Sequence, residues 1–401
     1  MNRKYGVLVI LSLLSVITFL DRNAISLAGQ RITEELSLSE NQFGWILSAF
    51  TISYALFEIP TGVLGDRMGA KKTLTRVVLW WSVFTMFTGL AGGFASLFFV
   101  RFLFGAGEAG AFPNMAIAVR RWFPVIERGR AQAVIWMSSR IGGALTPFLV
   151  IPLQMQFGWR LSFYILGALG LIWVIIWWFW YRDNDVTEEP VNQLAAAGRI
   201  SWKKWASSGN FWLLMIMYYC YVSGAYFFIL WLPKYLQNGR GIPEAQLAYS
   251  ASLPFILAAV GCLLGGSLSD FLVKRIGLNW GRRLVPLVGL SLSGTFMLSA
   301  AFTTSNPGAI VLLALGLAFM DVTVPVSWAV ATDLGGKDSG AITGAMNTAG
   351  QLGATVTSVG IGYLITSFHS YNLPVVILGI ELLVAASLWL LIKADKRIGT
   401  G

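Results

Sequence analysis

The sequence predicts an all-α membrane protein with twelve transmembrane helices in two pseudo-symmetric bundles of six, with both termini in the cytoplasm. Three observations predict this class. Hydrophobic residues make up 56% of the chain and charged residues only 12%, about half of the charged share of a typical soluble domain. The apolar residues form runs of about 20, the length that crosses a bilayer as a helix. The polar stretches between the runs carry most of the basic residues.

The expected spans follow from the apolar runs in chain order. Because the bilayer core holds no water, the backbone of each run must close its own hydrogen bonds, and each run is expected to be a helix. The strands of a membrane barrel would alternate apolar and polar residues over about ten positions, and these runs do not. The spans are expected at residues 6–28, 42–65, 73–92, 96–119, 129–151, 160–180, 209–236, 246–269, 284–302, 308–331, 339–363 and 371–392.

The basic residues set the expected orientation, because cytoplasmic loops are enriched in Lys and Arg. With the N-terminus inside, the cytoplasmic segments hold 22 basic residues and the opposite side holds 4. The first run follows Arg3 and Lys4 and is expected to be an uncleaved helix rather than a signal peptide. This asymmetry accounts for the net charge of +10 without nucleic acid. We expect a multi-pass protein of a bacterial inner membrane.

The two halves of the chain repeat one pattern. The polar stretch 181–208 is expected to be a cytoplasmic linker between bundles at 1–180 and 209–401. A run of glycines, an acid and basic residues follows the second span, and a similar run around Asp270, with an insertion, follows the eighth. The first copy contains Gly62, Gly65, Asp66, Arg67, Gly69, Lys71 and Lys72. We interpret both copies as a gating motif, the alternative being a plain basic loop. Parallel repeats of this kind place a substrate site between the halves, near the midplane.

Ionisable residues inside spans are costly and indicate a functional site. At about 1.5 Å per residue, Asp21 and Arg101 are expected at similar depths, where they can form an ion pair. Glu108 lies seven residues after Arg101, on the same face of its helix. Buried carboxyl groups can take up protons. Asp21 and Glu108 are therefore the expected proton carriers, with Arg101 as their partner.

Arg22 follows Asp21 and points about 100° away from it. An arginine does not shed its charge, and a carboxylate offers its guanidinium a planar, bidentate match. Arg22 is therefore expected to hold the carboxylate of a small organic anion. The alternative is a structural salt bridge with Asp21 or Glu108.

Other polar side chains inside spans are candidates to contact the same substrate. Tyr54 and Tyr226 lie among small or polar residues, and Arg140 stays open between a substrate contact and interhelical pairing. Hydroxyl groups often bond only to their own helix, whereas a buried amide needs a partner. The second half contributes Ser327, Asn347, Thr348 and Gln351.

Metal and cofactor chemistry is not expected. His369 is the single histidine, and Cys220 and Cys262 both lie in apolar runs without metal-ligand spacing. The glycine-rich run from Gly105 to Gly110 is not followed by Gly-Lys-Ser/Thr and is interpreted as a close-packing helix face rather than a phosphate loop. An intramembrane enzyme is therefore disfavoured.

The stretch from Gly62 to Lys72 closely matches the loop motif of the major facilitator superfamily. Three further stretches resemble the anion:cation symporter family, which includes bacterial galactonate, glucarate and hexuronate permeases, sialin and vesicular glutamate transporters. These stretches are Leu20 to Ser26, Arg101 to Asn114 and Trp122 to Ala131.

The resemblance implies the major facilitator fold and proton-coupled uptake of organic acids. It also implies that Arg22 contacts the substrate carboxylate, that Asp21 and Glu108 take protons with Arg101 as partner, and that Tyr54 lines the cavity. We therefore expect a monomeric symporter that imports a sugar acid, such as a hexonate or hexuronate, or a similar carboxylate, together with protons. An anion exchanger without proton coupling and a transporter-like sensor are the alternatives.

Overall fold

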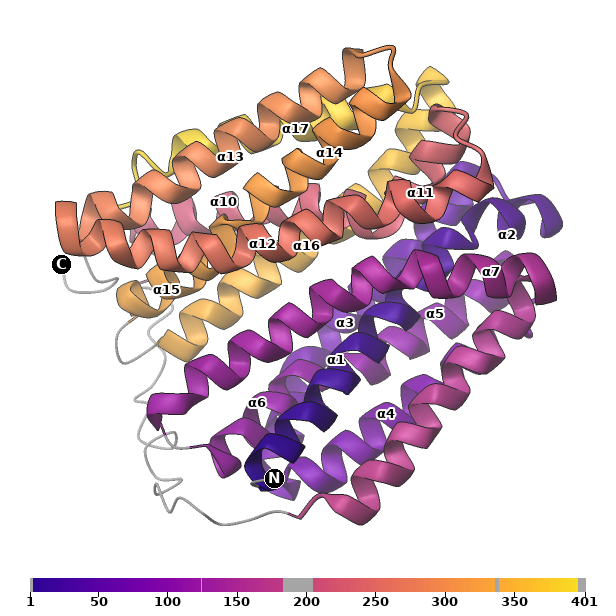
Figure 1. Cartoon of the computed structure of the whole chain (residues 1–401), viewed down its shortest axis with the longest axis horizontal. Helices are drawn as coiled ribbons and strands as arrows, with labels where there is room; N and C mark the ends of the chain where they lie inside the picture. Colours follow the sequence, from indigo (N-terminus) through magenta and orange to yellow (C-terminus); the bar gives the residue numbers. More distant parts are fainter. Residues whose placement is uncertain (1–2, 124, 183–204, 336–338, 396–401) are drawn as a thin grey trace. The chain divides into compact units, whose positions relative to one another are not determined.

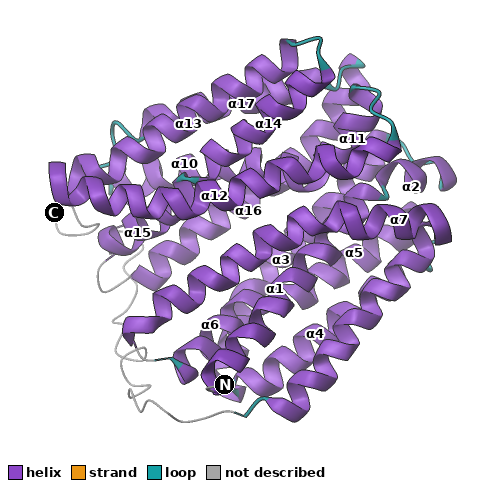
Figure 2. Cartoon of the chain, in the orientation of Figure 1, coloured by secondary structure: helices purple, strands orange, loops and turns teal. Residues whose placement is uncertain are grey.

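The computed structural model describes residues 3–123, 125–182, 205–335 and 339–395. These ranges are almost entirely helical and contain no strand (Figure 2). The predicted all-α class is confirmed. Seven of the described helical segments are long and apolar enough to cross a membrane. Most of the expected linker, at residues 183–204, lies outside the described residues.

The chain forms two compact units. Unit 1 comprises Met1–Glu188, Ile229–Ser252 and Ser358–His369. Unit 2 comprises Glu189–Phe228, Leu253–Thr357 and Ser370–Gly401. Two segments from the second half of the sequence, Ile229–Ser252 and Ser358–His369, therefore belong to unit 1.

The first seven helices belong to unit 1 (Figure 1). They are α1 (Arg3–Leu27), α2 (Gly29–Glu35), α3 (Glu40–Met68), α4 (Ala70–Thr88), α5 (Phe94–Glu108), α6 (Ala111–Trp122) and α7 (Val125–Trp180). Gly158 has a φ of 76°, which divides α7 into two helices. α7 packs along both α1 and α4, and α3 packs along α5.

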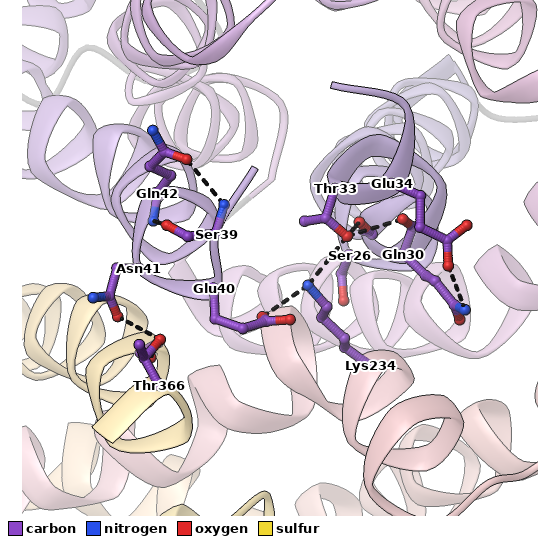
Figure 3. A network of polar contacts seen from close by, with 12 residues as sticks. Ser26, Gln30, Thr33, Glu34, Ser39, Glu40, Asn41, Gln42, Lys234 and Thr366 are labelled. Carbon is purple, nitrogen blue, oxygen red and sulfur yellow. Dashed lines mark hydrogen bonds and ion pairs between the residues drawn. The ribbon is translucent and has the colours of Figure 1, made fainter. Parts of the chain in front are cut away.

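Local signals explain where two of these helices begin. Ser39 and Gln42 form a reciprocal capping box that satisfies free N–H groups at the start of α3 (Figure 3). Pro113 lies in the first turn of α6, where its missing N–H costs no helical hydrogen bond. The expected fourth span is thus interrupted between Glu108 and Ala111.

The described part of the second half of the chain contributes α-helices and two short π-helices. They are α10 (Gly209–Tyr226), the π-helix η1 (Phe227–Trp231), α11 (Leu232–Lys234), the π-helix η2 (Tyr235–Gly239), α12 (Glu244–Ile276), α13 (Leu278–Phe302), α14 (Asn306–Asp321), α15 (Thr323–Gly335), α16 (Ser339–Phe368) and α17 (Asn372–Leu388). Within unit 2, α13 packs along α14 and α17.

The repeated motif ends in the same backbone turn in both halves. Gly69 separates α3 from α4 with a φ of 83°, and Gly277 separates α12 from α13 with a φ of 84°. Both lie in the left-handed region that favours glycine. Gly69 follows Asp66 by three residues, whereas Gly277 follows Asp270 by seven. The insertion therefore extends α12 by about one helical turn before the same turn occurs.

The glycine-rich helices pack closely, as the sequence indicates. A Cβ atom on Gly105 would lie 2.5 Å from the carbonyl oxygen of Phe50, where α5 meets α3. A Cβ atom on Gly142 would lie 2.8 Å from the carbonyl oxygen of Val16, where α7 meets α1. Only glycine permits backbones to approach this closely.

Candidate functional site

A buried cluster of charges lies between α1 and α5 in unit 1. Asp21 and Glu108 are fully buried, and Arg101 and Arg22 are 1% and 6% exposed. Four ionisable side chains at such burial carry a large desolvation cost unless each one is compensated. Their partners are therefore informative about function.

Arg22 and Glu108 form the ion pair of this cluster. The Nε atom of Arg22 donates a hydrogen bond of 3.0 Å to Oε1 of Glu108, and Nη2 donates to the same oxygen. The Arg22 guanidinium also lies 4.9 Å from the ring centre of Phe50 and 5.2 Å from that of Tyr54. Charge-assisted bonds and cation–π contacts together hold the guanidinium in place. Tyr54, predicted as a cavity residue, therefore contacts the predicted anchor.

The expected ion pair between Asp21 and Arg101 is not formed. Oδ2 of Asp21 accepts a hydrogen bond of 3.1 Å from the indole Nε1 of Trp81 instead. Among the described residues, Nε and Nη1 of Arg101 have no acceptor, and the guanidinium lies 4.1 Å from the ring centre of Phe104. The rise per residue predicts how deep a residue lies along its helix. Whether two residues pair also depends on the direction in which each side chain points around its helix axis, and the rise does not give that direction.

The polar candidates of unit 2 are only partly brought together. The hydroxyl of Tyr226 donates to Oε1 of Gln351 over 3.4 Å. Ser327 donates to the carbonyl of Thr323 in its own helix, the local bond that weakens its case as a ligand. On α16, Asn347 is half-buried and Thr348 is exposed.

The structure describes the positions of two further charged residues of the predicted spans. Arg140 lies half-buried on α7 of unit 1. Asp321 ends α14 of unit 2, fully buried, and its Oδ1 accepts a hydrogen bond of 2.7 Å from the hydroxyl of Tyr221.

The two copies of the gating motif are described to different extents. The surroundings of Gly62 and the side chains of Asp66 and Arg67 are not among the parts that the structure describes. In the first copy, Gly65 is buried, Gly69 forms the turn, and Lys71 lies 5.1 Å from the ring centre of Trp178, with Lys72 exposed.

In the second copy, Asp270 accepts a hydrogen bond of 2.8 Å from Nη1 of Arg282. The Nε atom of Arg282 also lies 3.7 Å from Asp333. A single guanidinium in unit 2 therefore bridges an acid at the end of α12 and an acid in α15.

One polar network in unit 1 was not identified from the sequence (Figure 3). Lys234, which lies near the end of the expected span 209–236, is 1% exposed, and its Nζ lies 2.8 Å from Oε2 of Glu40. The same Nζ lies 4.6 Å from the ring centre of Phe43 and 3.4 Å from the hydroxyl of Thr33. Nearby, the hydroxyl of Thr366 donates to Asn41 over 3.0 Å. Lys234 lies at the end of an apolar run, and polar residues follow it. A lysine in such a position can be buried or exposed, so the sequence did not indicate its burial.

Buried ion pairs inside apolar helices are typical of proteins that move charged solutes across a bilayer. The fold and the site thus define a membrane transporter rather than an enzyme. The chain belongs to the Major Facilitator Superfamily, whose family model matches residues 11–356.

The chain also matches individual transporters over nearly its whole length. It is 36% identical to a probable sulfoacetate transporter of Cupriavidus necator, over 96% of this chain and 92% of that protein. It is 32% identical to the hexuronate transporter of Bacillus subtilis, over 88% and 87%, and 30% identical to a probable galactarate/D-glucarate transporter of Escherichia coli, over 99% and 96%. The resemblance seen in the sequence motifs is confirmed.

A solved structure supports the fold. The crystal structure of a bacterial homologue of the human lysosomal transporter Spinster superposes with a TM-score of 0.84, covering 98% of this chain and 97% of that chain at 20% identity.

Proposed function

We propose that the protein imports a small organic anion together with protons by alternating access. In this proposal twelve spans, with both termini in the cytoplasm, form bundles at 1–180 and 209–401 joined by the linker 181–208. The protein acts as a monomer in a bacterial inner membrane. The similar transporters are named for sulfoacetate, hexuronate and galactarate/D-glucarate, and these are the first substrates to test.

The observation that carries this proposal is the buried Arg22–Glu108 pair. Arg22 is a permanent cation inside an apolar helix, 6% exposed, and its present counter-ion is a carboxylate of the protein. A carboxylate or sulfonate ligand offers the same oxygen geometry. The ligand can therefore replace Glu108 without leaving the guanidinium unpaired.

The same pair suggests how protons are coupled to the anion. Protonation of Glu108 removes its charge and weakens its hold on Arg22, which then accepts the substrate. Return of the proton to the cytoplasm restores the pair and expels the anion. Import of a monoanion with one proton moves no net charge, whereas two protons would gain about 2.3 kcal/mol per 100 mV of membrane potential.

The proposal also includes substrate contacts from the second half of the chain. Tyr226 and Gln351 already share a hydrogen bond. Arg140, Ser327, Asn347 and Thr348 remain candidates. The gating role of the motif from Gly62 to Lys72, and of Asp270, is likewise a proposal.

The test is uptake of radiolabelled sulfoacetate, galactarate and a hexuronate into proteoliposomes with an acidic exterior. We expect Arg22→Gln to lower both uptake and counterflow at least about tenfold, because it removes charge-assisted hydrogen bonds to the substrate. Arg160→Gln is the matched control, since Arg160 pairs with Glu35 near the surface of the same unit. Unchanged uptake in Arg22→Gln would refute the anchor.

Proton coupling is tested separately with Glu108→Gln. We expect this variant to retain counterflow but to lose the stimulation of uptake by a pH gradient. If the variant keeps that stimulation, Glu108 does not carry the coupled proton. Wild-type counterflow without any gradient-driven uptake would instead support an anion exchanger.

A further inference from the structure

Trp81 makes a contact with the charge cluster that was not predicted from the sequence. It lies on α4, is fully buried, and its Nε1 donates a hydrogen bond of 3.1 Å to Oδ2 of Asp21. Among the described residues, Oδ1 of Asp21 has no hydrogen-bond partner. The indole is therefore the hydrogen-bond donor that holds this carboxylate.

We propose that Trp81 is a positioning residue that orients the carboxyl group of Asp21 and favours its charged form, and so lowers the external pH at which transport begins. The inference rests on the proposed proton coupling and deepens it, with Asp21 as the second proton carrier beside Glu108, as the sequence predicts. An indole N–H is a donor only and does not accept a hydrogen bond. It therefore favours the carboxylate over the carboxylic acid.

The geometry also assigns the two oxygens of Asp21 different roles. Oδ2 is occupied by the donor on Trp81, and a proton placed there would face an N–H group. Oδ1 has no partner and is the oxygen left to take the proton. Trp81 thus orients the carboxyl group as well as stabilising its charge.

The helix that carries Trp81 is packed closely against α7. A Cβ atom on Gly170 of α7 would lie 3.2 Å from Cβ of Ser82, the neighbour of Trp81, and at an ordinary contact distance of 3.7 Å from Nε1 of Trp81. The hydroxyl of Thr85 donates to the carbonyl of Trp81 over 3.0 Å, within α4. α4 itself packs along α5 and α7.

Other charges act on Asp21 without replacing this bond. Arg101 and Glu108 face it from α5 with opposite signs, and Arg22 is its neighbour on α1. No ion pair joins Asp21 to either arginine among the described residues. The direct contact therefore comes from a neutral group whose donor capacity does not change with pH.

The experiment measures uptake against external pH for the wild type and for Trp81→Phe, which keeps an aromatic ring and loses the N–H. We expect the pH of half-maximal uptake to shift by about one unit to the alkaline side, because the carboxylate loses one charge-assisted hydrogen bond. Counterflow of substrate, which needs no net proton movement, should stay within about twofold of the wild type.

Trp173→Phe is the matched control. Trp173 is also buried in unit 1, and its Nε1 donates 2.8 Å to a backbone carbonyl, that of Ile10. A general effect of losing a buried indole N–H would move both profiles, whereas the proposed role moves only that of Trp81→Phe. In an Asp21→Asn background, Trp81→Phe should cause no further shift.

The outcomes separate this inference from the proposed function. A wild-type profile that is flat with pH would overturn proton coupling and the role of Trp81 together. A sloping wild-type profile that Trp81→Phe leaves unchanged would overturn the role of Trp81 alone. Folding is checked by size exclusion, and Trp81→Met, which also lacks the donor, carries the test if Trp81→Phe fails that check.

Discussion

The ion pair between Lys234 and Glu40 leads to an asymmetric prediction about stability. Lys234 is 1% exposed, whereas Glu40 keeps 22% of its side-chain exposure. Removing one partner of a fully buried pair costs about 3–5 kcal/mol, because a charge is left unpaired away from water. Glu40→Gln leaves the buried ammonium group of Lys234 without its carboxylate partner. We expect it to lower the free energy of unfolding by about 2 kcal/mol, less than the full range because water reaches this pair from one side.

The reverse change should cost less. Lys234→Met removes the buried charge and leaves Glu40, which can be hydrated, so a loss of about 1 kcal/mol is expected. The double variant should be more stable than the sum of the two single losses predicts, by a coupling energy of about 1 kcal/mol. Unfolding is followed in detergent by tryptophan fluorescence.

A second ion pair provides the control. Glu35 and Arg160 are joined at 3.0 Å in the same unit, but their side chains are 49% and 36% exposed. Their coupling should therefore be under about 1 kcal/mol. If Lys234→Met is the more damaging change, or if the double variant is simply additive, the reasoning from burial is refuted.

Two further predictions concern unit 1. A hydrogen bond from Trp159 and the neighbouring Arg160 lower the pKa of Glu35; the stabilisation from this carboxylate is present at neutral pH and is lost as the pH falls through its lowered value. Glu35→Gln should remove this loss of stability at acidic pH. If the free energy of unfolding of the variant falls with acid as much as that of the wild type, the prediction is wrong. Gly142→Ala should destabilise the protein by about 1–3 kcal/mol, because its Cβ would lie 2.8 Å from the carbonyl oxygen of Val16. Thermal unfolding of this variant should occur at a lower temperature, and a wild-type value would show that α1 and α7 can separate freely.

The burial of the charged residues was predicted from the sequence more successfully than their ion-pair partners were. Arg22, Arg101 and Glu108 lie inside apolar runs, and their burial follows from that position alone. Pairing depends on how each helix is rotated about its axis, and this rotation is fixed by contacts that the sequence does not state. As a result, Glu108 pairs with Arg22, the alternative considered above, whereas Asp21 bonds to Trp81 instead of Arg101.

Two contributors were missed for different physical reasons. Trp81 is one of 17 tryptophans, and an indole that bonds a carboxylate has the same sequence signature as one that faces lipid. Lys234 closes a predicted span, where a basic residue is normally an interfacial anchor. By contrast, the glycines at positions 69 and 277 were a usable signal for the two turns, although no turn was predicted there, because few residues other than glycine adopt that backbone conformation.

The π-helix η1, at Phe227–Trp231, determines which way Lys234 faces. A turn closed by i→i+5 bonds takes in more residues than an α-helical turn. Every residue after it is therefore rotated, by about 100° for each residue gained. An uninterrupted α-helix of the same sequence would carry the ammonium group around the axis and away from Glu40. Shortening this stretch by one residue would thus redirect a charge several positions downstream while leaving the amino acids that form the ion pair untouched.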